Sequence, residues 1–237
     1  SPDNVRKAIT PHTTLISIMA ANNEIGVLAP ITEIGRIAHE HEVIFHTDAT
    51  QAVGYIPIDV HAMNIDLLSM SGHKVYGPKG IGALYVRNRR PRVKLVEQMH
   101  GGGHERNMRS GTLNVPGIVG FGEALNIMQK ERPSESLRLQ QLRDFLWEGL
   151  RDSIKTIQLN GQLNQRLPHN LNIAIPGLES RSLVVQLKNV LAISTGSACT
   201  TAIVEPSHVI IALGFGDQRA HNSVRFGLGK GNTMSDV

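Results

Sequence analysis

The sequence predicts an α/β fold in which a mostly parallel sheet, covered by helices, is followed by a small α+β domain. Two observations predict it. Strand-length apolar runs alternate with a helical pattern in the first part of the chain, which is typical of βαβ units. Polar clusters directly follow three consecutive runs, and ligands of such sheets bind beyond the carboxyl ends of the strands. We therefore expect one site where these clusters meet.

Four short apolar runs predict the strands of the large domain. They are residues 15–19, 43–46, 67–70 and 81–86. Between the first two runs, Thr32 can cap a helix that ends at Glu40. Ile34, Ile37 and Ala38 share one face of this helix, which indicates a buried side.

A proline divides the helical middle of the chain. Two helices are predicted, over residues 116–132 and 135–153. Pro133 lies between them and marks a domain boundary, which assigns residues 1–132 to the large domain and residues 133–237 to the small one. The other elements of the small domain are strands at 170–175 and 192–194 and a helix at 181–189.

The composition narrows the class of protein. The chain has 237 residues, 41% of them hydrophobic, and no apolar run approaches the ~20 residues of a membrane helix. A net charge of +4 and 4% aromatic residues do not favour a nucleic-acid binder. The single cysteine, Cys199, excludes an internal disulfide and fits a reducing cytosol, so a cytoplasmic protein is expected. The polar start without an initiator Met indicates a fragment.

Residues 66–80 carry the most specific chemistry. After the strand, the chain turns at Gly72 and presents Ser71, His73 and Lys74 together. A lysine in a partly desolvated pocket can form a Schiff base with an aldehyde cofactor. His73 can hold a phosphate or move protons. The alternatives are a surface lysine and an ordinary polar loop histidine.

Asp48 follows a buried strand and stands among apolar residues. A buried carboxylate needs a cationic partner, which a protonated pyridine nitrogen would supply. Gln51 and Asn23 can donate to a ring hydroxylate. The alternatives are an Asp that caps a helix start and loop amides that bond their own backbone.

Residues 100–112 form a glycine-rich, cationic loop. Such a loop can cradle an anion through backbone amides and arginine side chains. Its HGGG start resembles the oxyanion-hole loop of esterases, but the chain contains no G-x-S-x-G, so that class is excluded.

Cys199 and Arg225 stand out in the small domain. Cys199 lies in a run of Gly, Ser, Ala and Thr, which favours an accessible nucleophile over a buried small hydrophobe. Arg225 lies within a strand-like run and needs an anion partner. Two partners of Arg225 stay open: a substrate carboxylate that it binds bidentately, and a carboxylate of the chain in an internal salt bridge.

Six short segments occur in one order along the chain. They are residues 22–26 (NNEIG), 48–51 (DATQ), 71–74 (SGHK), 100–105 (HGGGHE), 109–112 (RSGT) and 196–200 (GSACT). Taken together, they resemble the pyridoxal-phosphate cysteine desulfurases of the NifS/IscS type, and the resemblance runs along nearly all of the chain. It implies pyridoxal 5'-phosphate as cofactor, the aspartate-aminotransferase-like fold called type I, and a homodimer.

The resemblance also implies a role for each residue of the cofactor site. These are Lys74 as the Schiff-base lysine, Asp48 at the pyridine nitrogen, Gln51 and Asn23 at the ring, Ser71 and His73 at the phosphate, and Thr112 at the phosphate of the neighbouring subunit. Lys74, His73 and Cys199 would be the catalytic residues.

By the same resemblance, Arg225 and Asn23 bind the substrate, L-cysteine. Cys199 attacks the substrate sulfur, which leaves a persulfide on Cys199 and releases L-alanine. The segment around Cys199 resembles the long-loop form associated with iron–sulfur cluster assembly, so the acceptor would be an iron–sulfur scaffold or another sulfur-acceptor protein. Cys199 would then also be a shared ligand of an iron–sulfur cluster.

Two other functions stay open at this point. One is a selenocysteine lyase or another pyridoxal-phosphate lyase on the same fold, and the other is a non-catalytic sulfur-relay or scaffold module. The family also has an amino-terminal portion, with a phosphate-anchoring loop and a ring-stacking histidine, that nothing in this chain matches. The isolated chain is therefore expected to bind the cofactor weakly and to turn over poorly.

Overall fold

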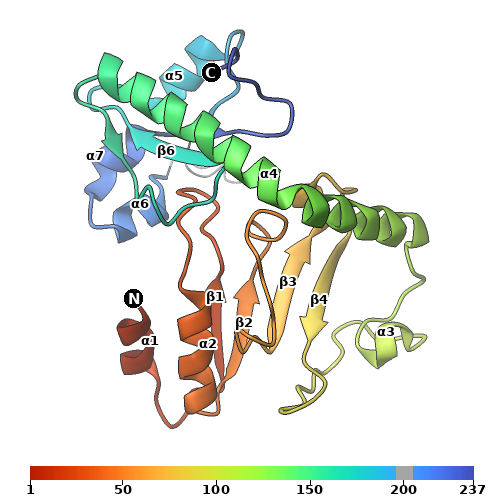
Figure 1. Cartoon of the computed structure of the whole chain (residues 1–237). Coiled ribbons are helices and arrows are strands. Elements are labelled where there is room, and N and C mark those ends of the chain that lie inside the picture. The colour runs from red at the N-terminus through yellow and green to blue at the C-terminus, as the bar shows by residue number, and fades with distance from the viewer. Residues whose placement is uncertain (196–204) are drawn as a thin grey trace. The chain divides into compact units, whose positions relative to one another are not determined.

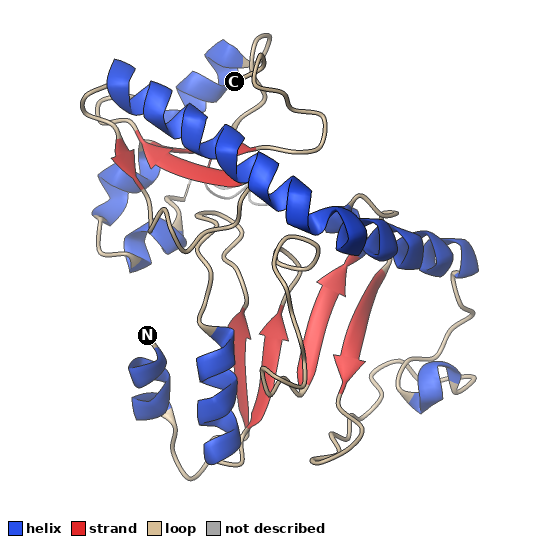
Figure 2. Cartoon of the chain, in the orientation of Figure 1, coloured by secondary structure: helices blue, strands red, loops and turns tan. Residues whose placement is uncertain are grey.

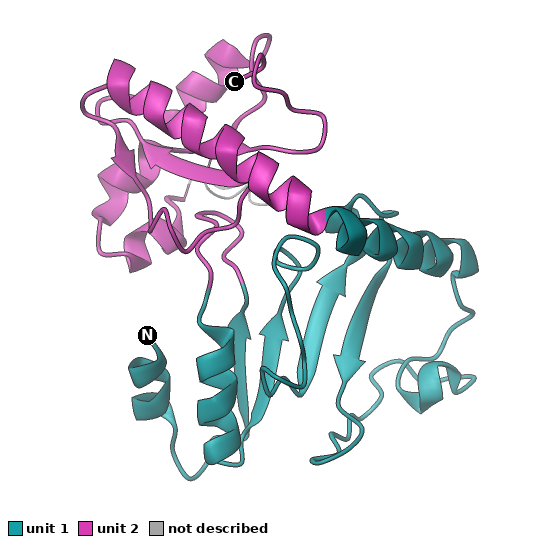
Figure 3. Cartoon of the chain, viewed as in Figure 1, with its two compact units in different colours: residues 1–20, 29–131 teal, residues 21–28, 132–237 magenta. Residues whose placement is uncertain are grey.

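A computed structural model describes the chain apart from residues 196–204 (Figure 1), and its helices, strands and loops are shown in Figure 2. The chain forms two compact units (Figure 3). Unit 1 comprises residues 1–20 and 29–131, and unit 2 comprises residues 21–28 and 132–237. Cys199 lies outside the described residues, so its proposed role stays a prediction.

Unit 1 is built on a four-stranded sheet with the strand order β1-β2-β3-β4. The strands are β1 (Leu15–Met19), β2 (Ile44–Asp48), β3 (Leu67–Ser71) and β4 (Gly82–Val86). The first three strands are parallel, whereas β4 runs antiparallel to β3. The predicted mostly parallel sheet is therefore confirmed. Because parallel strands point the same way, the carboxyl ends of β1, β2 and β3 lie at one edge of this sheet.

Helix α2 (Ile31–Glu40) packs on this sheet through its apolar side. Ile34 and Ile37 are buried there. Gly35 makes the closest approach: a Cβ atom at this position would lie 2.0 Å from the carbonyl oxygen of Met63. Only glycine therefore allows the helix to sit this close to the neighbouring backbone.

The start of α2 and three short helices differ from the sequence prediction. Thr32 is not the cap, because α2 begins at Ile31 after Pro30 and no side chain caps it. The short helices are α1 (Pro2–Ala8), the 3-10 helix η1 (Gly72–Val75) and α3 (His104–Asn107). Each has at most two turns, too few to produce a recognisable helical period.

Helix α4 (Val115–Ser153) is a single helix where the sequence predicts two. Pro133 lies inside it, and an interior proline costs about 3 kcal/mol. Met128 before Pro133, and Leu139 and Leu142 after it, are buried, and burial stabilises each by about 1.5–3 kcal/mol. These contacts offset the cost of the proline, so the helix continues. The division between the two units falls inside this helix, just before the proline.

Unit 2 contains a second sheet, antiparallel, with the order β5-β6-β8-β7. Its strands are β5 (Gln158–Leu159), β6 (Asn170–Ala174), β7 (Ser194–Thr195) and β8 (Ser223–Gly227). Leu171, Ile173 and Val224 form its buried core, and Leu146 and Trp147 of α4 pack against them. The unit also contains α5 (Ser180–Leu187), α6 (His208–Ala212) and α7 (Gly216–His221).

Residues 21–28 belong to unit 2, although the sequence predicts that they are part of the large domain. Backbone hydrogen bonds hold them there. The Leu28 N–H donates to the carbonyl of Gln165 at 2.9 Å, and the Leu167 N–H donates to the carbonyl of Gly26 at 2.8 Å. A pairing between residues this far apart in sequence leaves no local signal.

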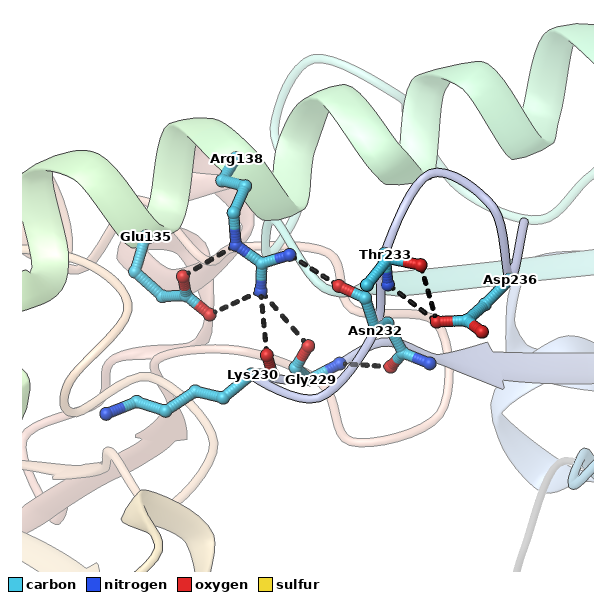
Figure 4. A network of polar contacts seen from close by, with 7 residues as sticks. All are labelled: Glu135, Arg138, Gly229, Lys230, Asn232, Thr233 and Asp236. Carbon is cyan, nitrogen blue, oxygen red and sulfur yellow. Dashed lines mark hydrogen bonds and ion pairs between the residues drawn. The ribbon is translucent and has the colours of Figure 1, made fainter.

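Arg138 holds the end of the chain within unit 2 (Figure 4). Its guanidinium pairs with Glu135 through two hydrogen bonds of 2.8 Å. It also donates to the carbonyl oxygens of Asn232 at 2.6 Å and Gly229 at 3.2 Å. The hydrogen bond from Arg138 holds the pKa of Glu135 below its ordinary value of 4.5. One side chain thus links the last residues of the chain to α4.

Candidate active site

The carboxyl ends of β2 and β3 form the candidate site in unit 1. Asp48 at the end of β2 is the register partner of Ser69 on β3, and the Ala49 N–H donates to the Ser69 carbonyl at 2.9 Å. The polar residues that follow the two strands therefore start from adjacent positions. The structure thus brings together two of the three predicted polar clusters.

Asp48 is half-buried. One of its carboxyl oxygens, Oδ1, accepts the N–H of Thr50 at 2.9 Å. This bond closes a turn, so Asp48 is not the cap of a helix. Among the described residues, nothing donates to the second oxygen, which leaves it available to a bound cation. Gln51, also half-buried, lies in the same turn.

Ser71, His73 and Lys74 lie where β3 leads into the 3-10 helix η1. Ser71 Oγ and His73 Nδ1 are 2.8 Å apart, so this hydroxyl and this imidazole form one polar pair. Gly72 between them has no room for a side chain, because a Cβ atom would lie 2.9 Å from the carbonyl oxygen of Pro78. The tight turn therefore sets the spacing of the three polar groups.

Lys74 is exposed, so the expectation of a partly desolvated lysine is wrong for this chain. The next residue, Val75, is only 1% exposed and anchors the helical turn in the core. The lysine backbone is thereby held at the site, while its side chain is open to solvent. Lys74 is thus exposed and the adjacent Val75 is buried. The polar sequence around Lys74 does not indicate this difference.

The donor set at this edge fits a phosphorylated pyridine aldehyde. An amine (Lys74) can bind the aldehyde, a carboxylate (Asp48) can accept from the ring nitrogen, and a hydroxyl and an imidazole can donate to the phosphate. These groups come from the ends of two adjacent strands of one sheet. The residues present therefore fit the cofactor that the sequence predicts.

The glycine-rich loop 100–112 does not offer all of its amides to an anion. The Gly103 N–H donates to Ser110 Oγ, and the Gly111 N–H donates to His104 Nδ1, both at 3.2 Å. The N–H groups of Gly103 and Gly111 are therefore not available to an anion, which corrects the prediction for these two groups. Thr112, which follows them, is exposed and keeps its hydroxyl accessible.

Asn23 and Arg225 meet in unit 2. Arg225 Nη1 donates to the carbonyl oxygen of Asn23 at 2.7 Å, and Arg225 Nε donates to Ser194 Oγ at 3.1 Å. No described carboxylate pairs with Arg225, so the internal salt bridge is ruled out within the described residues. Ser194 is a partner that the sequence does not indicate, because a serine in a small-residue run carries no signal.

The described residues show neither a membrane-spanning helix nor a cluster of metal ligands. None of the helices there is both long and apolar enough to cross a membrane. Nor do any three His, Cys, Asp or Glu side chains of these residues gather as metal ligands would.

Comparison with known proteins identifies the class. The family model described as aminotransferase class V matches residues 1–237, and the chain belongs to this family. The family resemblance and the fold class predicted from the sequence are thereby confirmed.

The names of similar proteins are more specific than the description of the family. The chain is 53% identical over 236 residues to the cysteine desulfurase IscS of Anaeromyxobacter dehalogenans strain 2CP-C, a match that covers 100% of this chain and 58% of that protein. It is 56% identical over 225 residues to the cysteine desulfurase IscS of Edwardsiella ictaluri strain 93-146, covering 95% and 55%. The chain thus spans between half and two thirds of the length of these curated relatives.

Solved structures of similar proteins agree with this family assignment. A NifS-like protein superposes with a TM-score of 0.89 at 33% identity, covering 100% of this chain and 61% of that one. DndA from Streptomyces lividans superposes with a TM-score of 0.80 at 38% identity, covering 96% and 64%.

Proposed function

We propose that this chain is part of a pyridoxal 5'-phosphate-dependent cysteine desulfurase, which converts L-cysteine to L-alanine and places the sulfur on Cys199 as a persulfide. The observation that carries the proposal is the set of Asp48, Ser71, His73 and Lys74 at the ends of two adjacent parallel strands. The identity of about half of all residues with proteins named cysteine desulfurase supports it.

The residues of unit 1 would hold the cofactor. Lys74 would bind the aldehyde through its Nζ atom, Asp48 would accept a hydrogen bond from the protonated ring nitrogen, and Gln51 would contact the ring. Ser71 and His73 donate to the phosphate. When bound, the cofactor supplies a ring that takes up electron density from the substrate.

The other proposed steps belong to residues of the chain itself. Lys74 Nζ would accept the substrate α-proton and would later return a proton to the same carbon. Arg225 binds the substrate carboxylate and Asn23 contacts the substrate. The Cys199 thiolate attacks the substrate sulfur: an S–S bond forms, the C–S bond breaks, and the carbon keeps the bonding pair and takes up a proton. The products are alanine and a persulfide.

The assembly and the destination of the sulfur are part of the proposal. The protein would act in the cytoplasm as a homodimer, in which Thr112 reaches the phosphate in the neighbouring subunit. The persulfide would pass to an iron–sulfur scaffold or another acceptor protein.

Lys74→Ala tests the cofactor anchor in the full-length protein. We expect the visible absorbance band of bound cofactor to disappear, and borohydride to leave no cofactor mass on the peptide that contains residue 74. Lys79→Ala is the matched control, since Lys79 is an exposed lysine of the following turn. Cofactor fixed on Lys79 in the wild type would contradict the proposal, and a wild-type protein that fixes none would favour the non-catalytic module.

Cys199→Ser separates the desulfurase from a lyase. This variant is expected to retain the cofactor band but to lose sulfide release from L-cysteine in the presence of thiol. A selenocysteine lyase, or another lyase that uses no persulfide, would keep its activity.

A further inference from the structure

A buried polar network in unit 2 surrounds the turn that carries Asn23. Asn22 Oδ1 accepts the N–H groups of Glu24 and Ile25 at 2.9 and 3.0 Å, which closes the turn. Glu24 is only 2% exposed. A buried acidic side chain in a loop needs polar partners, because its desolvation is otherwise costly.

Two elements, β6 and α6, hold Glu24. Its main-chain carbonyl accepts the side-chain amides of Asn172 at 3.0 Å and Asn170 at 3.4 Å, both on β6. Its carboxyl oxygen Oε2 accepts the hydroxyl of Ser207, the residue that caps α6. The turn is thus fixed to β6 through the backbone and to α6 through the glutamate side chain.

The same turn orients Arg225. Asn172 on β6, which donates to the Glu24 carbonyl, is the register partner of Arg225 on β8. Arg225 Nη1 donates to the Asn23 carbonyl, and Nε donates to Ser194 Oγ. Among the described residues, Nη2 has no acceptor, and Nη1 has one further hydrogen. The Nη1–Nη2 edge of the guanidinium is therefore the edge left for a ligand.

We propose that Glu24 is a positioning residue for recognition of the substrate carboxylate by Arg225. The inference rests on the proposed function, in which Arg225 binds that carboxylate. Bidentate recognition requires the guanidinium plane to be held in one orientation. The Asn23 carbonyl supplies this orientation, and Glu24, the next residue, keeps the carbonyl in place through Ser207, Asn170 and Asn172.

The test compares two ligands of the full-length, cofactor-loaded protein by titration calorimetry. L-Alanine carries the carboxylate, and L-alaninamide replaces it with a neutral amide. The wild type should bind L-alanine more tightly than L-alaninamide. In Glu24→Ala this preference should narrow about tenfold, the effect expected for one charge-assisted hydrogen bond. The KM for L-cysteine should rise while kcat changes little.

Three further variants distinguish positioning from folding. Glu24→Gln keeps an oxygen that accepts from Ser207, so it should restore most of the preference. Ser194→Ala removes the acceptor of Nε and should narrow the preference without touching Glu24. Glu179→Ala is the matched control, since Glu179 accepts the hydroxyl of Ser182 at 2.7 Å and caps α5 in the same unit. It should leave the preference unchanged.

The outcomes separate the two proposals. A wild-type preference that survives in both Glu24→Ala and Ser194→Ala overturns the positioning role and leaves the proposed function intact. A wild type without any preference for the carboxylate overturns both. If Glu24→Ala does not fold, Ser207→Ala removes the hydroxyl that holds the Glu24 side chain, and an unchanged preference in that variant overturns the inference.

Discussion

Replacing Asp66 with alanine is expected to destabilise unit 1 by about 3–5 kcal/mol, the usual result of breaking a buried ion pair from one side. Asp66 precedes β3, and its Oδ1 lies 2.8 Å from Arg87 Nε, with the two side chains 10% and 12% exposed. Its Oδ2 accepts the N–H of Phe45 on β2 at 2.9 Å. The substitution would thus leave a buried guanidinium without its carboxylate and a buried backbone N–H without an acceptor.

The orphaned N–H by itself accounts for about 1–3 kcal/mol of this loss. Arg87 keeps part of its hydrogen bonding, because it also donates to the carbonyl of Ile65 at 3.0 Å. Asp66→Asn retains an acceptor for the Phe45 N–H, but it loses the charge and turns an amide NH2 group toward Arg87 in place of the second oxygen. The aspartate-to-asparagine change should therefore lower the free energy of unfolding by less than the change to alanine.

Urea unfolding measures this loss. With a slope of about 2 kcal/mol/M, Asp66→Ala should lower the urea midpoint by about 2 M. Circular dichroism follows both units, whereas Trp147, the single tryptophan, lies against the core of unit 2. The fluorescence transition should therefore shift less than the dichroism transition. Arg36→Ala is the control, because the Arg36–Glu40 pair is exposed to solvent and should contribute little to stability. A loss in Asp66→Ala as small as in this control would refute the reasoning.

Two other variants test the packing of the fold. Arg138→Met should loosen residues 229–237, seen as faster amide exchange there. Because Arg138 lowers the Glu135 pKa, the wild-type pair contributes stability that is present above pH 4.5 and is lost as the pH falls below it. The melting temperature of the variant should consequently fall less steeply below pH 4.5, and an unchanged slope would contradict this role. Gly35→Ala forces a Cβ atom against the Met63 carbonyl and should lower the free energy of unfolding by about 1–3 kcal/mol. In contrast, Gly149→Ala in α4, where a Cβ meets open space, should stabilise by about 0.5–1 kcal/mol, and equal effects of the two changes would show that the close approach is not rigid.

Local patterns were sufficient for the strands of unit 1. The apolar run at residues 15–19 is β1 itself, because a five-residue strand needs only a short run of mostly apolar side chains and a turn at its end. Asp48 and Ser71 could be placed at strand ends for the same reason. Their proximity then follows from the parallel pairing of β2 and β3.

Other features depend on contacts that no local pattern records. Pro133 predicts a break in α4, yet buried leucines on its carboxyl-terminal side keep the helix continuous. The sequence predicts that the backbone N–H groups of the glycine-rich loop bind an anion. In the structure, the N–H groups of Gly103 and Gly111 instead donate to Ser110 and His104.

By itself, the sequence determined the family, the strand positions of unit 1 and the residue types of the proposed cofactor site, since these depend on neighbours in the chain. Only the tertiary structure decided that residues 21–28 join unit 2 and that Lys74 is exposed. It also decided that Arg225 donates to a carbonyl 202 positions away. The physical reason is that burial and long-range hydrogen bonds depend on which segments meet after the chain has closed on itself, and a local sequence window does not contain both partners.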